Sequence, residues 1–184
     1  HGIVWTEFAK AVGSIAYIVR ARFVGLRDIG AALSPQSAFN IIQGLETVSL
    51  RMEKHCSNAA KVAEYLSSHN KVSKVIYAGL DDGEAGERAN KYLKGGHGAL
   101  CGIELKGGKA SGEKFINNLN MFYHVANIGD ARSLAIHPAS TTHSQLSDEE
   151  MESAGVTPSY VRLSIGIEHI DDIIEDLKNA LDAA

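Results

Sequence analysis

Residues 159–167 read Ser-Tyr-Val-Arg-Leu-Ser-Ile-Gly-Ile, and apolar side chains alternate there with polar or small ones. A period of two places successive side chains on opposite faces of a β-strand. The members of the apolar face, which would pack into a core, are Val161, Leu163, Ile165 and Ile167. The members of the other face are Tyr160, Arg162, Ser164 and Gly166. We therefore predict a strand over residues 160–167 with one buried face and one open face.

The stretches on either side of this strand predict helices and further strands joined by short links. The segment from Ile170 to Leu181 has helical apolar spacing, and Asp171 and Asp172 in its first turn complement the helix dipole. Upstream, predicted strands cover 72–77, 100–105, 122–128 and 134–136. Predicted helices cover 84–93, 109–119 and a short segment from Ser147, whose spacing to Glu150 is that of a capping box.

Two amphipathic helical faces precede residue 70. Apolar residues recur at steps of three and four from Phe8 to Leu26 and again from Ile41 to Leu66, and Ser34 before Pro35 predicts an N-cap between them. Unbroken, the second helix would cover roughly 30 residues and about 45 Å, which exceeds the width of a small domain. We predict an α+β fold: a small sheet with helices packed on it, preceded by two long helices. Residues 1–69 would form long interdomain helices, and residues 70–184 a small C-terminal α+β domain.

Composition and charge narrow the class of protein. The 184 residues are 45% hydrophobic and 22% charged, with a formal net charge of −4, so the chain offers no basic surface for nucleic acid or anionic lipid. Cys56 and Cys101 are the two cysteines and lack C-x-x-C spacing, which fits a reducing cytoplasm. No apolar run is long enough to span a bilayer. The chain opens on His1, with apolar periodicity starting almost at once, as expected for a segment entered within a longer protein.

Arg162 is the most informative candidate for a binding site. A guanidinium held on a rigid strand between a tyrosine and a serine can grip a carboxylate through two parallel hydrogen bonds. From the pattern alone, an ordinary exposed arginine on the open face of a sheet is the favoured interpretation, because most arginines are exposed.

A second segment, residues 126–143, carries a predicted tight bend and two histidines. Asn127 and Gly129 suit a bend with exposed backbone N–H groups, which is a candidate anion contact. His137 and His143 are six residues apart, a spacing that does not match helical metal ligands, so we interpret them as hydrogen-bonded turn residues and predict no metal site.

Three stretches carry a resemblance to a known family. They are "LRDIGAALSPQSAFNIIQGLETVSLRMEKHC" from residue 26, "NIGDARSLAIHPASTTHSQLS" from residue 127 and "VRLSIGIEHIDDIIEDLKNAL" from residue 161. They resemble the pyridoxal-phosphate (PLP) enzymes of Cys/Met metabolism, and within that family the O-acetylhomoserine sulfhydrylases most. The wider family usually has Ser-Leu-Gly where this chain has Asn127-Ile128-Gly129, which favours the sulfhydrylase branch.

The resemblance implies a fold, a reaction and a set of binding residues. The fold would be the C-terminal domain of PLP fold type I, which closes over the substrate beside a missing N-terminal PLP domain. The parent would be a homotetramer, a dimer of dimers, that forms homocysteine and acetate from O-acetylhomoserine and sulfide. Arg162 would bind the substrate carboxylate, Asn127 would orient it, and Thr142 would lie near the site. The PLP lysine, ring-stacking tyrosine and pyridine aspartate of the family all precede this chain.

Because those residues are missing, the resemblance implies no catalytic and no cofactor-binding residue in this chain. We expect the isolated chain to be inactive and not to bind PLP. Two alternatives stay open: a non-catalytic amino-acid-binding or assembly module on the same scaffold, and the same domain from a cystathionine synthase or lyase. We expect the chain to bind a small-molecule substrate, and we expect it to bind neither nucleic acid nor a membrane.

Overall fold

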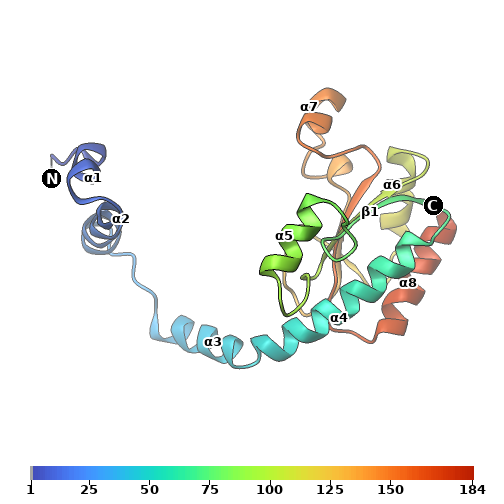
Figure 1. Ribbon diagram of the computed structural model, residues 1–184, viewed down its shortest axis with the longest axis horizontal. Helices are drawn as coiled ribbons and strands as arrows, with labels where there is room; N and C mark the ends of the chain where they lie inside the picture. The colour runs from blue at the N-terminus through green and yellow to red at the C-terminus, as the bar shows by residue number, and fades with distance from the viewer. Residues whose placement is uncertain (1) are drawn as a thin grey trace. The chain divides into compact units, whose positions relative to one another are not determined.

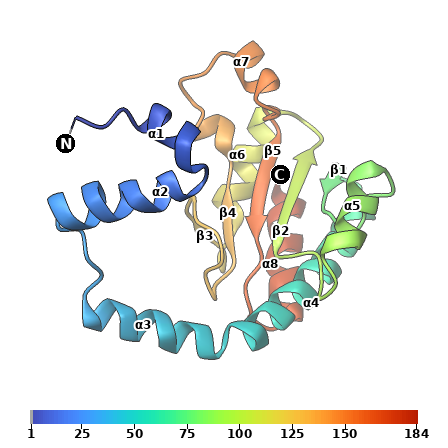
Figure 2. The same cartoon turned by 60° about the vertical axis from the view of Figure 1, so that its left-hand side comes forward.

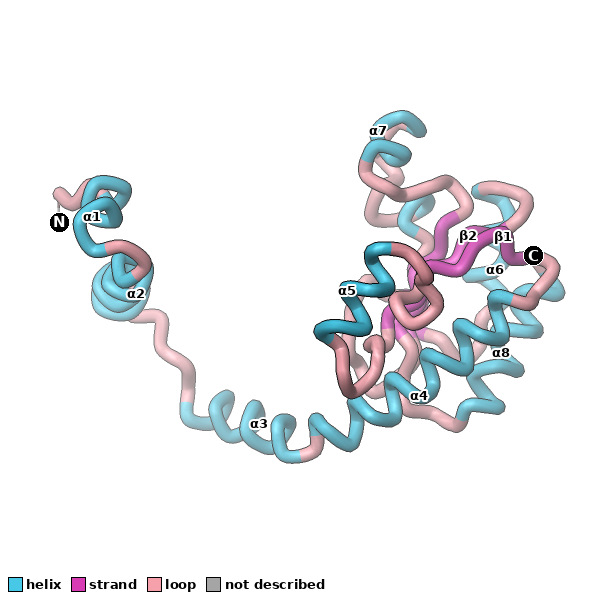
Figure 3. Tube along the Cα trace, in the orientation of Figure 1, coloured by secondary structure: helices cyan, strands magenta, loops and turns pink. Residues whose placement is uncertain are grey.

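A computed structural model describes residues 2–184, except for the side chain of residue 148. The chain forms two compact units, residues 1–47 and residues 48–184. The described part of the first unit consists of helices and loops (Figure 3). Its helices are α1 (Trp5–Val12), α2 (Ile15–Arg20), a π-helix η1 (Ala21–Asp28) and α3 (Pro35–Glu46). None of the helices in the described part of the chain is long and apolar enough to cross a membrane.

Each of the two long helices expected from the apolar spacing is interrupted. The first is broken at Gly13, whose φ of 65° and ψ of −144° lie outside the helical region and whose N–H donates to the Ala9 carbonyl. The second is broken at Thr47 (φ −111°, ψ 6°), which separates α3 from α4 (Val48–Ser67). The predicted N-cap is confirmed, because the Ser34 hydroxyl accepts a hydrogen bond from the Ser37 N–H at 3.1 Å.

The second unit contains a five-stranded sheet in the order β1-β2-β5-β4-β3. The pairs β1/β2, β2/β5 and β5/β4 are antiparallel, and β4/β3 is parallel. The strands are β1 (Val72–Ile76), β2 (Leu100–Leu105), β3 (Tyr123–His124), β4 (Leu134–Ile136) and β5 (Tyr160–Ser164). The last strand in the sequence is therefore the central strand of the sheet.

Three helices cover one face of this sheet. α6 (Lys109–Asn118) and α8 (Ile170–Ala183) lie behind the strands in Figure 2. α4 contacts β1 and β2 and runs beside α8 in Figure 1. Their apolar residues meet Cys101, Ile103, Val161 and Leu163 of the central strands in one core. The remaining helices are α5 (Glu84–Tyr92), the 3-10 helix η2 (Pro138–Ser140) and α7 (Asp148–Ser153). The α+β fold is confirmed, as is the predicted capping box between Ser147 and Glu150.

Two strands are shorter than the sequence predicts. The strand expected over 122–128 is reduced to β3, because the chain bends away at residues 126–132. β5 ends at Ser164, where its partners change: the Ile165 N–H donates to the Ala99 carbonyl and the Ile167 N–H to the Ala131 carbonyl, both at 2.9 Å. The end of β5 is thus bound to the loop that precedes β4.

We expect Cys101 to resist alkylation in the folded protein. The residue is fully buried, and burial raises the pKa of its thiol to about 12. Because the thiolate is the reactive form, iodoacetamide at about pH 8 should leave Cys101 unmodified until guanidinium unfolds the protein. Peptide-resolved mass spectrometry before and after unfolding checks this result. Equal labelling of Cys101 in the two states would contradict the buried environment.

Candidate functional site

The candidate site lies on the face of the sheet opposite the three helices. Arg162 of β5 pairs in register with Gly102 of β2 and Ile136 of β4, so the three residues share this face. A Cβ atom at residue 102 would lie 2.6 Å from the Tyr160 ring. Because residue 102 is a glycine, the Tyr160 ring can pack over β2 at that position. The ring forms one wall of the site beside Arg162.

A cleft of about 460 Å³ opens over this face within the second unit. Its floor comes from β4 and β5, and its rim comes from the segments around η2 and after α7. The lining residues are Ala126, Ile136, Pro138, Thr142, His143, Ala154, Gly155, Val156, Tyr160 and Arg162. The Arg162 guanidinium is the permanently charged group of this lining, which makes the cleft suited to an anion.

Arg162 is half-buried and has one hydrogen bond within the described part of the chain. Its Nη2 donates to the main-chain carbonyl of Asn127 at 3.3 Å. None of the described residues that line the cleft is a carboxylate, so none of them neutralises the other guanidinium N–H groups. A guanidinium carries five N–H donors, and a bidentate grip on a carboxylate uses two of them. The geometry leaves donors for an external carboxylate.

Tyr160 contributes a neutral hydroxyl beside this charge. Burial raises the pKa of Tyr160, and the nearby Arg162 guanidinium only partly offsets that effect. The phenol therefore stays protonated at neutral pH and does not form an ion pair with Arg162. It can donate one hydrogen bond to an anion bound in the cleft.

Of the other two predicted binding residues, Thr142 is among the residues that line the cleft and Asn127 is not. Thr142 lines the cleft, and its Oγ1 lies 2.9 Å from His143 Nδ1. Asn127 contacts Arg162 through its main-chain carbonyl, while its side-chain Oδ1 accepts from the Ile128 N–H at 2.9 Å. The predicted bend is present, with a φ of 78° at Gly129. The structure thus joins Arg162 to the Asn127 loop through the backbone of residue 127.

Both histidines of this region have hydrogen-bond partners, as expected for turn residues. His137 is fully buried; its Nδ1 lies 2.8 Å from Ser140 Oγ and its Nε2 2.8 Å from the Pro158 carbonyl. Because a carbonyl only accepts, Nε2 carries the proton. His137 therefore ties η2 to the segment before β5 and supports the rim of the cleft.

Sequence reasoning missed a polar cluster at the end of β5, formed by His55, Asn58, Ser133 and Glu168. The first two lie on α4, and their side chains are bound to main-chain carbonyls at 165, 166 and 168. Ser133 and Glu168 bind each other through two hydrogen bonds. Asn58 contacts residues 108 and 110 positions away, so spacing along the chain carries no signal for this cluster.

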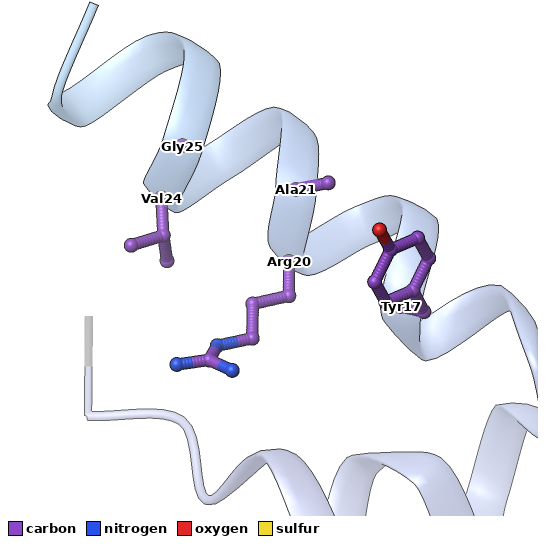
Figure 4. Close-up of a pocket in the computed structure, with 5 residues that line it drawn as sticks. All are labelled: Tyr17, Arg20, Ala21, Val24 and Gly25. Carbon is purple, nitrogen blue, oxygen red and sulfur yellow. The ribbon is translucent and has the colours of Figure 1, made fainter. Parts of the chain in front are cut away.

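A second hollow, of about 240 Å³, lies in the first unit. Tyr17, Arg20, Ala21, Val24 and Gly25 line it, and Figure 4 shows Arg20 and Val24 on the same side of the helical segment. A hollow on a single helix encloses a ligand less well than a cleft between strands and loops. The cleft over β5 is therefore the stronger candidate.

Comparison with known sequences places the chain among enzymes. The family described as Cys/Met metabolism PLP-dependent enzyme matches residues 1–182. The chain is 52% identical, over 98% of its length, to an O-acetyl-L-homoserine sulfhydrylase from Leptospira meyeri, and 48% identical over its whole length to a homocysteine synthase from Schizosaccharomyces pombe. It is 46% identical, over 88% of its length, to an L-methionine gamma-lyase from Fusobacterium nucleatum subsp. polymorphum. It spans 42%, 42% and 41% of the lengths of these relatives.

Comparison with solved structures finds the same kind of enzyme as the comparison with known sequences. A crystal structure described as an O-acetylhomoserine (thiol)-lyase from Campylobacter jejuni superposes with a TM-score of 0.81 at 44% identity. The match covers 89% of this chain and 39% of that protein, which contains a pyridoxyl-lysine group.

Proposed function

Because this chain belongs to the family of PLP-dependent enzymes of Cys/Met metabolism, we propose that its parent protein is an O-acetylhomoserine sulfhydrylase. The parent would convert O-acetylhomoserine and sulfide into homocysteine and acetate. This chain would contribute the part of the active site that binds the amino-acid substrate. The supporting relatives are two O-acetyl-L-homoserine sulfhydrylases and a homocysteine synthase, at about half identity along nearly the whole chain.

The observation that carries the proposed role of this chain is the Arg162 guanidinium in the cleft over β5. None of the described residues in that lining is a carboxylate, and the guanidinium is held by the central strand of the sheet. A fixed guanidinium that grips the α-carboxylate would align the bonds at the substrate α-carbon with the reacting groups. Asn127 would hold Arg162 in place through its carbonyl, and Thr142 would contact the bound substrate from the rim.

The cofactor would be held by the remainder of the parent protein. PLP acts as an electron sink for bond cleavage next to the α-carbon. The described lining of the cleft over β5 contains no lysine and no carboxylate, so these residues alone do not fit PLP. The part this chain plays is therefore to bind and orient the substrate.

The partners we propose are the remainder of the parent and further copies of it, in a dimer of dimers. Within the described part of the first unit, Ala16 is the buried residue of its helices. Large apolar side chains there are exposed, including Tyr17 at 80% and Ile29 at 73%. Exposed apolar surface of this extent is typical of an interface. Both cysteines are free, which fits a cytoplasmic protein.

Product analysis tests the proposed reaction. We expect the full-length protein, supplied with PLP, O-acetylhomoserine and sulfide, to form homocysteine and acetate, measured by liquid chromatography and mass spectrometry. Chain 1–184 alone should form none, because no lysine is among the described residues that line its cleft. Homocysteine produced by the isolated chain would contradict the proposal that this chain only binds the substrate and that the remainder of the parent holds the cofactor.

Two parallel reactions separate the alternatives. The match to an L-methionine gamma-lyase makes methionine the first alternative substrate, with methanethiol as its product. Cysteine in place of sulfide tests a cystathionine synthase. Faster turnover in either reaction than with O-acetylhomoserine and sulfide would assign the parent to that branch, and absence of turnover in all three would favour a non-catalytic module.

A further inference from the structure

The polar cluster at the end of β5 is placed where it can control the geometry of the carboxylate site. Glu168 is half-buried and follows β5 by four residues. Its Oε1 accepts from the Ser133 N–H at 2.6 Å and its Oε2 from the Ser133 hydroxyl at 2.9 Å. The same hydroxyl accepts from the Gly166 N–H at 2.9 Å. Through Ser133, the carboxylate thus joins the exit of β5 to the entrance of β4.

These two ends carry the two halves of the proposed carboxylate site. Arg162 lies on β5, four residues before Gly166. Asn127, whose carbonyl holds the Arg162 guanidinium, lies in the loop of residues 125–133 that enters β4 at Ser133. The Glu168 carboxylate therefore fixes one end of that loop against the strand that presents the guanidinium.

The junction is held from the opposite side by α4. The His55 Nδ1 lies 2.6 Å from the Ile165 carbonyl, and the Asn58 amide donates to the carbonyls of Gly166 and Glu168 at 3.0 and 2.9 Å. His55 and Asn58 are 2% and 0% exposed, so water does not compete for these bonds. The backbone beyond β5 is thus fixed on two sides, and Glu168 supplies the link to the Asn127 loop.

Gly166 shows how closely this junction is packed. A Cβ atom there would collide with the Glu168 carboxylate and would lie 2.5 Å from both the Ala131 carbonyl and the Ser133 nitrogen. Such distances to backbone atoms leave no room for a larger residue. The Glu168 carboxylate is therefore packed directly against the Gly166 backbone, in a junction that has little free space.

We propose that Glu168 is a positioning residue for the substrate carboxylate, acting through Ser133 to hold the Asn127 loop and the Arg162 guanidinium in register. This inference rests on the proposed role of Arg162. Glu168 is not among the residues that line the cleft, so its effect would pass through the backbone of residues 127–133 and 162–166.

The test measures how well the full-length holoenzyme distinguishes a carboxylate from a neutral amide. The readout is the ratio of kcat/KM for O-acetylhomoserine to kcat/KM for its α-carboxamide. We expect Glu168→Gln to lower this ratio about tenfold, mainly by raising KM for the carboxylate substrate. Hydrogen–deuterium exchange should increase in peptides covering 126–134 and 164–169. Glu175→Gln, an exposed residue of α8, is the matched control and should change neither quantity.

Further variants make each outcome decisive. Ser133→Ala removes only the shared hydroxyl and should lower the ratio in the same direction, so it replaces Glu168→Gln if that variant does not fold. Arg162→Lys must itself lower the ratio; if it does not, the carboxylate clamp is wrong and the role of Glu168 is overturned with it. If Arg162→Lys lowers the ratio but Glu168→Gln and Ser133→Ala do not, the clamp stands and the positioning role of Glu168 is refuted.

Discussion

Replacing Arg162 with methionine in the full-length enzyme is expected to lower kcat/KM for O-acetylhomoserine by roughly 100- to 1,000-fold, which corresponds to about 3–4 kcal/mol of lost transition-state binding. The reason is that the guanidinium is the permanently charged group in the lining of the cleft. Without it, the substrate carboxylate would be desolvated next to Ile136 and Pro138 with no charged partner. Steady-state kinetics with O-acetylhomoserine and sulfide measure the effect.

A lysine at the same position should recover part of the loss. Its ammonium keeps the charge but cannot form two parallel hydrogen bonds in one plane. The matched control is Arg88→Met: Arg88 is an exposed residue of α5 whose Nη2 lies 3.1 Å from Glu84, and its loss should leave kcat/KM unchanged. An equal loss for Arg162→Met and Arg88→Met, or no loss for Arg162→Met, would remove Arg162 from the site.

The largest expected effect on stability comes from Asp176 of α8. This carboxylate is 7% exposed and accepts three main-chain N–H groups of the link between α6 and β3: Asn120 and Met121 at 2.9 Å and Phe122 at 3.3 Å. Asp176→Ala leaves these donors without their partner, and Phe122 is buried at 6% exposure. We expect the free energy of unfolding to fall by about 3–5 kcal/mol.

Chemical denaturation of the full-length protein, combined with hydrogen exchange of peptides around residue 120, measures this loss. Exchange at Asn120, Met121 and Phe122 should rise first, because those N–H groups lose their acceptor. Asp172→Ala is the control, because this residue is exposed in the first turn of the same helix. Its substitution should lower the free energy of unfolding by only a few tenths of a kcal/mol. Equal destabilisation by the two substitutions would contradict the role of Asp176.

Local features of the fold were predictable from the sequence because a few neighbouring residues determine them. The caps at Ser34 and Ser147 and the alternation from Tyr160 to Leu163 depend on side chains within a few positions, and the structure confirms them. Ser164 and Gly166, which were predicted on the open face, are buried instead, where the end of β5 packs against Ser133 and α4. The α+β class followed from the same local patterns. The helix breaks at Gly13 and Thr47 were missed because the apolar spacing continues across both of them.

The site was predictable only in part. Alternation places Arg162 on the open face, but the residue pattern alone favoured an ordinary surface arginine, and the binding roles of Arg162, Asn127 and Thr142 remain predictions. Asp176 and Glu168 gave no signal, because each lies in or near the closing helix and binds backbone that folding brings to it from 35 to 56 residues away. The predicted division into long interdomain helices over residues 1–69 and a small α+β domain over residues 70–184 also remains a prediction.

The order β1-β2-β5-β4-β3 has a consequence during synthesis on the ribosome. Four strands emerge before the one that joins them, so the nascent polypeptide holds two separated pieces, β1 with β2 and β3 with β4. The inner edges of β2 and β4 stay unpaired until residues 160–164 arrive, and unpaired edges invite pairing with other chains. A translational pause shortly before residue 160 would therefore prolong the interval in which this polypeptide is most prone to aggregate or to need a chaperone.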